Sequence, residues 1–144
     1  MAVEFELELM WIPVSDVDRA KRFYLEQAGF DLLVDLPNGL PGQRIVQVTP
    51  PGSACSIGFG TGVTPARPGS QQGLFIVADV VAARDELAAR GVNVGEVKHI
   101  IDGAWVSGPA PGRADYMSLV EFSDPDGNLW LLQERRGQPA TPDR

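Results

Sequence analysis

The fold is decided by two matching stretches, Val14-Ser-Asp-Val-Asp-Arg-Ala-Lys and, 63 residues later, Val77-Ala-Asp-Val-Val-Ala-Ala-Arg. In each stretch an apolar segment comes first, and an aspartate, Asp16 or Asp79, can cap the helix that follows. In each stretch the apolar residues at helical spacing are followed by a glycine, Gly29 or Gly91, where helices commonly end. The two stretches therefore indicate an internal repeat in which a strand is followed by a helix.

A second pair of matching motifs extends the repeat toward the end of each copy. Thr49-Pro-Pro-Gly and Asp124-Pro-Asp-Gly are 75 residues apart, and both have the composition of a turn between strands. In the first copy the apolar pattern predicts strands over residues 5–14, 30–34, 44–48 and 54–59. In the second copy it predicts strands over residues 73–78, 92–101, 117–122 and 129–133. Each copy is therefore expected to be a βαβββ module, and the fold class is α+β.

The boundaries of the two modules follow from composition. We expect the modules at residues 1–60 and 72–134, joined by a linker over 61–71 that is rich in Gly, Thr, Pro and Ser. The second module is longer because of a Gly/Pro-rich insertion at residues 102–115. The polar, Pro-rich residues 135–144 are expected to form a flexible tail.

Composition excludes several classes of protein. A formal net charge of −7 argues against a nucleic-acid partner, which requires a basic surface. Cys55 is the single cysteine and cannot form an internal disulfide, and no apolar run approaches the ~20 residues of a membrane-spanning helix. The first residues lack the basic and apolar segments of a secretion signal, so we expect a cytoplasmic protein with no membrane partner.

Two longer motifs resemble those of the vicinal oxygen chelate superfamily. They are Val14-Ser-Asp-Val-Asp-Arg-Ala-Lys-Arg-Phe-Tyr and Phe122-Ser-Asp-Pro-Asp-Gly-Asn-Leu-Trp-Leu-Leu-Gln, within a resemblance that runs from about Leu7 to Glu134. The superfamily includes glyoxalase I, extradiol dioxygenases, fosfomycin-resistance proteins and bleomycin-binding proteins. The resemblance implies a U-shaped, mostly antiparallel sheet around a cavity that holds a small-molecule ligand. It also implies a homodimer, which the edge strands of each module favour as well.

The resemblance further identifies four positions where metal-dependent members carry ligands. A histidine seven residues before the capping aspartate corresponds to Leu9 and Gln72, and a glutamate seven residues after Asp124 corresponds to Leu131. The repeat maps Leu131 onto Ser56. None of these side chains is an imidazole or a carboxylate, so we expect no bound metal and no other cofactor. This departure argues against glyoxalase, dioxygenase and fosfomycin-type activities.

Strand alternation predicts the ligand-binding residues, because side chains two apart share a face. We expect Trp11 to act as a stacking wall, with an alternative role as a core residue. Trp105 and Tyr116 flank the insertion and are interpreted as a lid or as loop anchors. Arg44 is a candidate for binding an anionic ligand, with ion pairing to surface acids as the alternative. The expected cavity lining is completed by Leu9, Pro13, Ser56, Gln72, Leu74, Ile76, Leu129, Leu131 and Gln133.

These residues support two main hypotheses, and whether the protein is an enzyme stays open. The first is metal-independent binding of a hydrophobic or aromatic small molecule, as in drug sequestration or resistance. The second is a cofactor-free acid/base enzyme, an isomerase, lyase or hydrolase, with His99, Glu121 and Tyr116 as catalytic candidates. His99 and Glu121 also have simpler interpretations, as a structural histidine and a solvated charge. A metalloenzyme with relocated ligands is a third possibility.

Overall fold

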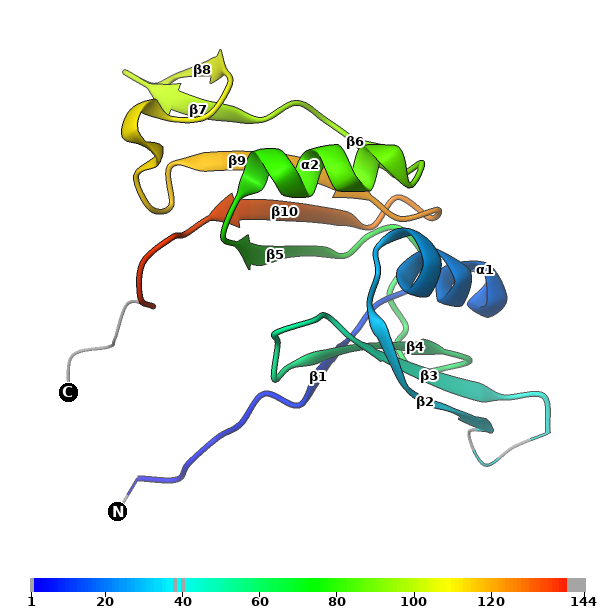
Figure 1. Ribbon diagram of the computed structural model, residues 1–144. Helices are drawn as coiled ribbons and strands as arrows, with labels where there is room; N and C mark the ends of the chain where they lie inside the picture. The colour runs from blue at the N-terminus through cyan, green and yellow to red at the C-terminus, as the bar shows by residue number, and fades with distance from the viewer. Residues whose placement is uncertain (1, 38, 40, 140–144) are drawn as a thin grey trace. The chain divides into compact units, whose positions relative to one another are not determined.

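The computed structural model describes residues 2–37, 39 and 41–139, which form two compact units. Unit 1 comprises Met1–Gln71 and Asp124–Asn128, and unit 2 comprises Gln72–Ser123 and Leu129–Arg144. Each unit contains one sheet of mostly antiparallel strands and one main helix (Figure 1), which confirms the predicted α+β class. The cavity between the modules and the homodimer remain predictions.

Unit 1 has the strand order β1-β4-β3-β2, in which only β1 and β4 run parallel. β1 is much shorter than the strand predicted over residues 5–14, because β4 begins at Ser56 and leaves the residues before Leu9 without a ladder partner. β1 lies at an edge of the sheet and ends before Pro13, as expected for a strand next to a proline. The elements of unit 1 are β1 (Leu9–Trp11), α1 (Val17–Arg22), η1 (Phe23–Gln27), β2 (Asp31–Pro37), β3 (Arg44–Thr49) and β4 (Ser56–Gly60).

The helix of unit 1 begins where the sequence predicted and ends in a wider turn. Asp16 caps it by accepting a hydrogen bond from the Arg19 amide at 3.0 Å. η1 is a π-helical turn, and in it two consecutive aromatic side chains, Phe23 and Tyr24, are both buried against each other edge to face. Gly29, with a φ of 80°, then allows the chain to leave the helix.

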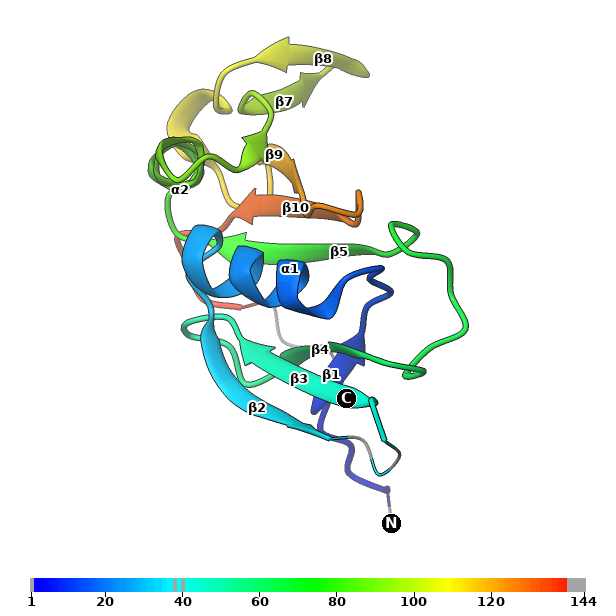
Figure 2. The ribbon, with the colours of Figure 1, turned by 90° about the vertical axis from the view of Figure 1, so that its right-hand side faces the viewer.

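Unit 2 repeats this strand order as β5-β10-β9-β7, with β8 added at the edge and β6 also paired with β9 (Figure 2). The strand predicted over residues 92–101 is broken into β6 and β7. The elements are β5 (Gln72–Val77), α2 (Val80–Ala89), β6 (Asn93–Val94), β7 (Lys98–Ile101), β8 (Ala104–Ser107), η2 (Pro111–Arg113), β9 (Ser118–Ser123) and β10 (Leu129–Glu134).

The predicted insertion over 102–115 is not entirely a loop. Its first residues form a tight hairpin in which Ile101 pairs with Ala104. Asp102 and Gly103 make the two-residue turn, with φ values of 50° and 78° that are typical of an Asp-Gly hairpin. The turn thereby adds β8 to the sheet, a strand that was not predicted.

A buried glutamate anchors the helix of unit 2. Glu134 is fully buried, accepts a hydrogen bond from the Val80 amide at 2.9 Å and forms an ion pair with Arg113. The Arg113 hydrogen bond holds the pKa of Glu134 below its usual value, because the arginine favours the charged form. Asp79 caps the same helix end through the Ala82 amide, as the sequence predicted.

Three of the residues that the sequence analysis placed in the tail are tied to the chain. The Arg135 amide donates to the Val77 carbonyl, and the Arg136 and Gly137 amides donate to the carboxylate of Asp115. Residues 140–144 of the predicted tail lie outside the described part of the chain. No helix among the described residues is long and apolar enough to cross a membrane.

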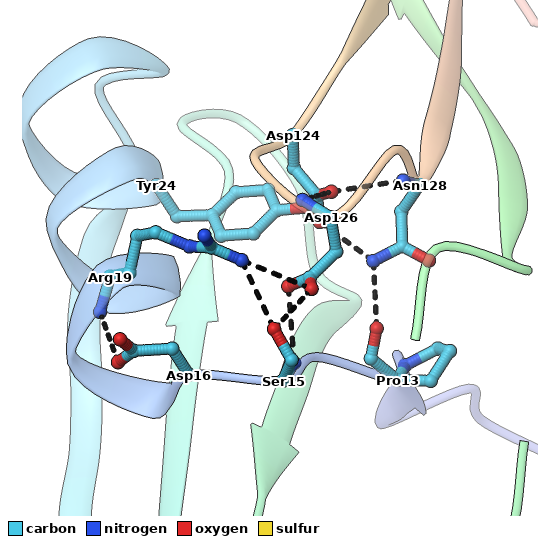
Figure 3. A network of polar contacts seen from close by, with 8 residues as sticks. All are labelled: Pro13, Ser15, Asp16, Arg19, Tyr24, Asp124, Asp126 and Asn128. Atoms are coloured by element: carbon cyan, nitrogen blue, oxygen red, sulfur yellow. Dashed lines mark hydrogen bonds and ion pairs between the residues drawn. The ribbon is translucent and has the colours of Figure 1, made fainter. Parts of the chain in front are cut away.

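The Asp124–Asn128 turn belongs to unit 1, although the sequence analysis placed it in the second module. Asp124 is buried and accepts hydrogen bonds from the Tyr24 hydroxyl at 2.8 Å and from the Asn128 side chain at 2.7 Å (Figure 3). Asn128 in turn donates to the Pro13 carbonyl at 2.9 Å. Nearby, Asp126 accepts a hydrogen bond from Ser15. The turn therefore fixes the chain directly after β1.

Replacing Tyr24 by phenylalanine tests this network, because it removes only the hydroxyl, which is one of the donors to Asp124. We expect Tyr24→Phe to lower the free energy of unfolding by about 1 to 2 kcal/mol, measured by urea denaturation. The matched control is Tyr116→Phe, since Tyr116 is partly exposed and should tolerate the change. Equal stability of the two variants would show that the Tyr24 hydroxyl is not required by Asp124.

Candidate ligand-binding site

The strand register of unit 1 places two kinds of side chain on opposite faces of its sheet. Ile57 and Phe59 of β4 lie on the side of α1 and η1, since the ring centroid of Phe59 is 5.7 Å from that of Tyr24 in η1. Alternation then puts the neighbouring residues on the other side. We call this side the unit 1 face; its members are Leu9, Trp11, Val34, Ile45, Gln47, Thr49, Ser56 and Gly58.

Trp11 lies across this face because its neighbour has no side chain. Trp11 is paired with Gly58 in the parallel ladder. A Cβ atom added to Gly58 would be 2.7 Å from Cζ3 of the indole, so the ring occupies the space that a side chain would take. Trp11 as a residue is 37% exposed, and a partly exposed aromatic side chain can accept a stacking partner. This geometry fits the predicted stacking wall.

The polar groups on the unit 1 face are few and mostly satisfied. The Ser56 and Thr49 hydroxyls are bonded to each other at 2.8 Å. Gln47 is only 9% exposed, and its Nε2 atom has no hydrogen-bond partner among the described residues. Gln47 was not a candidate in the sequence analysis. The available signal was its place between two valines in a strand that is otherwise apolar at its centre.

In unit 2 the corresponding face of the sheet carries most of the other candidates. Alternation and register place on it Gln72, Leu74, Ile76, Lys98, Ile100, Trp105, Leu119, Glu121, Leu129, Leu131 and Gln133. This unit 2 face is mainly apolar. Lys98 lies over the Trp105 ring, 4.7 Å from its centroid, and forms an ion pair with Glu121 at 3.8 Å. Glu121 is therefore paired with a lysine.

The register also corrects the repeat mapping of the family's metal-ligand positions. Leu131 is paired with Leu74, whose counterpart 63 residues earlier is Trp11. Trp11 is paired with Gly58, so Gly58 rather than Ser56 is the structural counterpart of Leu131. The mapping was wrong by two residues, because the matched turn motif begins seven residues before β4, at Thr49, but five residues before β10, at Asp124.

The four positions do not fit a metal after this correction. They read Leu9, Gly58, Gln72 and Leu131, and only the glutamine has a side-chain donor atom. Divalent metals in such sites bind imidazole or carboxylate groups. Within the described residues, no cluster of three or more His, Cys, Asp or Glu side chains is arranged to hold an ion.

Two candidates lie on the opposite faces of their sheets. Arg44 is bonded to Asp35 at 2.8 Å and to Asp18 at 2.5 Å, which is the ion pairing considered as its alternative role. The hydrogen bond from Arg44, and after it the one from Lys21, hold the pKa of Asp35 far below its usual value. His99 is 5% exposed on the side of α2, and its Nδ1 is 2.7 Å from the Gly108 carbonyl oxygen.

The two remaining candidates, Tyr116 and Pro13, are held by hydrogen bonds to their backbone groups. Tyr116 has a φ of 69°, its amide donates to the Glu134 carbonyl, and its carbonyl accepts from the Gln133 side chain at 2.9 Å. Pro13 is buried, and its carbonyl accepts a hydrogen bond from the Asn128 side chain. Tyr116 is thus tied to β10, and Pro13 to the Asp124–Asn128 turn.

Comparison with known proteins agrees with this fold. The chain matches the model of the Glyoxalase/Bleomycin resistance protein/Dioxygenase superfamily over residues 6–132, and it belongs to that superfamily. The sequence resemblance is thereby confirmed.

Similar proteins include two solved structures from Streptomyces sp. CB03234. TnmS3, described as an antibiotic binding protein, is 38% identical, with 93% of this chain and 98% of that chain covered and a TM-score of 0.70. A glyoxalase/bleomycin resistance protein is 37% identical, with 90% and 100% covered and a TM-score of 0.68. The uncharacterized protein YetH of Bacillus subtilis is 28% identical over 126 residues, with 84% of this chain and 91% of YetH covered.

The position of Trp11 can be tested with a Gly58→Ala substitution. The added methyl group should displace the indole, because the nearest atoms it meets belong to a partly exposed side chain. We expect a shift in Trp11 fluorescence, recorded in a Trp105→Phe, Trp130→Phe background, with a stability loss of about 1 kcal/mol.

The matched control for this test is Gly95→Ala. A Cβ atom there would make only an ordinary contact, 3.7 Å from the Glu121 carbonyl oxygen. If Gly58→Ala left the Trp11 emission as unchanged as the control does, the indole would not lie over Gly58.

Proposed function

We propose that this protein binds a hydrophobic, aromatic small molecule without a metal and protects a cell by sequestering it. The observation that carries the proposal is the Trp11 indole, which lies over Gly58 on an apolar sheet face. A large, partly exposed aromatic surface with few polar groups around it suits a flat organic ligand. Trp105, Leu74 and Leu131 give the unit 2 face a similar character.

The similar proteins support a binding role of this kind. TnmS3 shares 38% of its residues with this chain over nearly its whole length and is described as an antibiotic binding protein. The superfamily to which the chain belongs includes bleomycin resistance proteins by name. Binding alone can confer resistance, because a tightly held antibiotic no longer reaches its target.

Metal independence is proposed from the chemistry of the side chains. Leu9, Gly58 and Leu131 have no donor atoms, and Gln72 offers a weak neutral amide where metal-dependent members have histidine. A metal held by so few donors would be lost to water and buffer.

The acid/base alternative has weaker support. It would depend on Glu121 and Tyr116, since His99 lies on the helix side of its sheet and bonds a backbone carbonyl. Glu121 is paired with Lys98 at 3.8 Å, an arrangement common for surface charges.

Metal independence predicts that chelation leaves binding intact. We expect protein treated with EDTA to bind an aromatic antibiotic with the same Kd as untreated protein, measured by quenching of tryptophan fluorescence. Elemental analysis should find no stoichiometric Zn, Fe, Mn or Ni. Loss of binding on chelation, with recovery when one of these metals is restored, would contradict the proposal.

Sequestration predicts protection without chemical change. A sensitive bacterium that expresses the protein should tolerate a higher concentration of at least one antibiotic from a panel of planar aromatic compounds that also includes bleomycin. The compound should be recovered intact from the purified protein. Conversion to a product would instead support the enzyme alternative.

The role of Trp11 in this protection is tested by Trp11→Ala. We expect at least tenfold weaker binding, because a stacked aromatic contact of about 1.5 kcal/mol or more is lost. Met10→Ala is the matched control, since Met10 is adjacent and similarly exposed but lies on the other face of the strand.

A further inference from the structure

We propose that Gln47 is the polar anchor of this site and that its side-chain amide donates a hydrogen bond to a carbonyl on a planar aromatic ligand. The inference rests on the function proposed above and narrows its ligand class. It assigns a role in specificity to a residue that neither the motifs of the chain nor its family positions single out.

The side-chain nitrogen of Gln47 is a buried donor that makes no hydrogen bond among the described residues. The residue is 9% exposed, and its Nε2 atom has no partner among the described residues. Leaving such a group buried and unbonded costs about 1 to 3 kcal/mol, and the large majority of buried side-chain polar atoms in proteins avoid that cost. A retained exception on a candidate binding face indicates that a ligand supplies the missing acceptor.

The register brings Gln47 into line with the stacking wall. Trp11, Gly58, Gln47 and Val34 are directly paired across four adjacent strands and form one row on the unit 1 face. Gly58 separates Trp11 from Gln47 and contributes no side chain, and the indole already lies over it. The amide and the indole are therefore the two nearest functional groups on this row.

The backbone fixes the side of the sheet on which the amide lies. β3 is an inner strand, paired with β4 and β2, so its alternation cannot be reversed without loss of both ladders. Val46 and Val48, on either side of Gln47, are fully buried on the side of α1. Gln47 is thereby held on the unit 1 face.

The polar groups of the unit 1 face favour a ligand with an uncharged hydrogen-bond acceptor. The Ser56 and Thr49 hydroxyls are bonded to each other, and Arg44 is paired with Asp35 and Asp18 on the other side. No lysine, arginine or histidine is a member of the unit 1 face, so an anionic ligand would gain no ion pair there. A carbonyl conjugated to a ring system fits an amide donor beside an indole.

The spacing also limits the size of the ligand. Neighbouring strands are about 4.8 Å apart, and the indole leans over the strand between Trp11 and Gln47. The carbonyl oxygen of the ligand should therefore lie about 5 Å, or one strand spacing, to the side of the ligand ring that stacks on the indole. A fused ring system with a carbonyl on an inner ring meets this condition.

Two probes with one ring skeleton test the proposal. 9-Fluorenone and fluorene are both flat tricyclic molecules, and they differ in a carbonyl group that replaces a methylene. We expect the wild-type protein to bind 9-fluorenone at least tenfold more tightly than fluorene, measured by quenching of tryptophan fluorescence. Gln47→Leu should bind the two probes equally and keep the wild-type affinity for fluorene.

Stability provides a second measurement that a purely structural role would not reproduce. Gln47→Leu removes a buried side-chain nitrogen that has no partner among the described residues, so its midpoint of urea unfolding should equal or exceed that of the wild type. If Gln47 were bonded within the protein, the midpoint would fall. Gln27→Leu is the matched control, the same substitution on η1 away from the face, and it should keep the tenfold preference.

The outcomes separate the two proposals. Equal binding of both probes by the wild type would overturn the role of Gln47 while supporting aromatic binding. A tenfold preference that persists in Gln47→Leu would also overturn it. If the wild type bound neither probe, both the anchor and the proposed function would be contradicted.

Discussion

The buried carboxylate of Asp124 requires hydrogen-bond donors, and separate segments of unit 1 supply them. Asp124 is almost completely buried, and burial of its carboxylate without hydrogen bonds would be strongly unfavourable. It accepts them from the Tyr24 hydroxyl, from the Asn128 side chain and from two amides of its own turn. Through Asn128 the same network reaches the Pro13 carbonyl and therefore fixes the end of β1, the strand that carries Trp11.

Local signals in the sequence were sufficient for most of the fold. Asp16 and Asp79 cap their helices as expected, because capping depends on residues only three positions apart. The Asp102-Gly103 hairpin was also a local signal, and it was missed because the Gly/Pro-rich composition of the segment suggested a loop. The attachment of Asp124 to Tyr24 involves residues 100 positions apart, so nothing in either local pattern could predict it.

The candidate site was predictable to the extent that it depends on strand alternation. Leu9 and Trp11 lie on the expected face, since alternation follows directly from the extended backbone. Gln47 could not be identified in this way, because an unsatisfied donor is a property of the surroundings and not of the residue. The sides taken by Arg44 and His99 depend on the pairing register with neighbouring strands, which composition does not reveal.

The glycine under Trp11 also decides which other side chains this position could hold. Gly58 stands where metal-dependent members of the superfamily would place a carboxylate, and the indole fills the space above it. A glutamate at position 58 would need the volume that the indole now occupies. In this chain the indole of Trp11 and a carboxylate side chain at position 58 therefore compete for the same space.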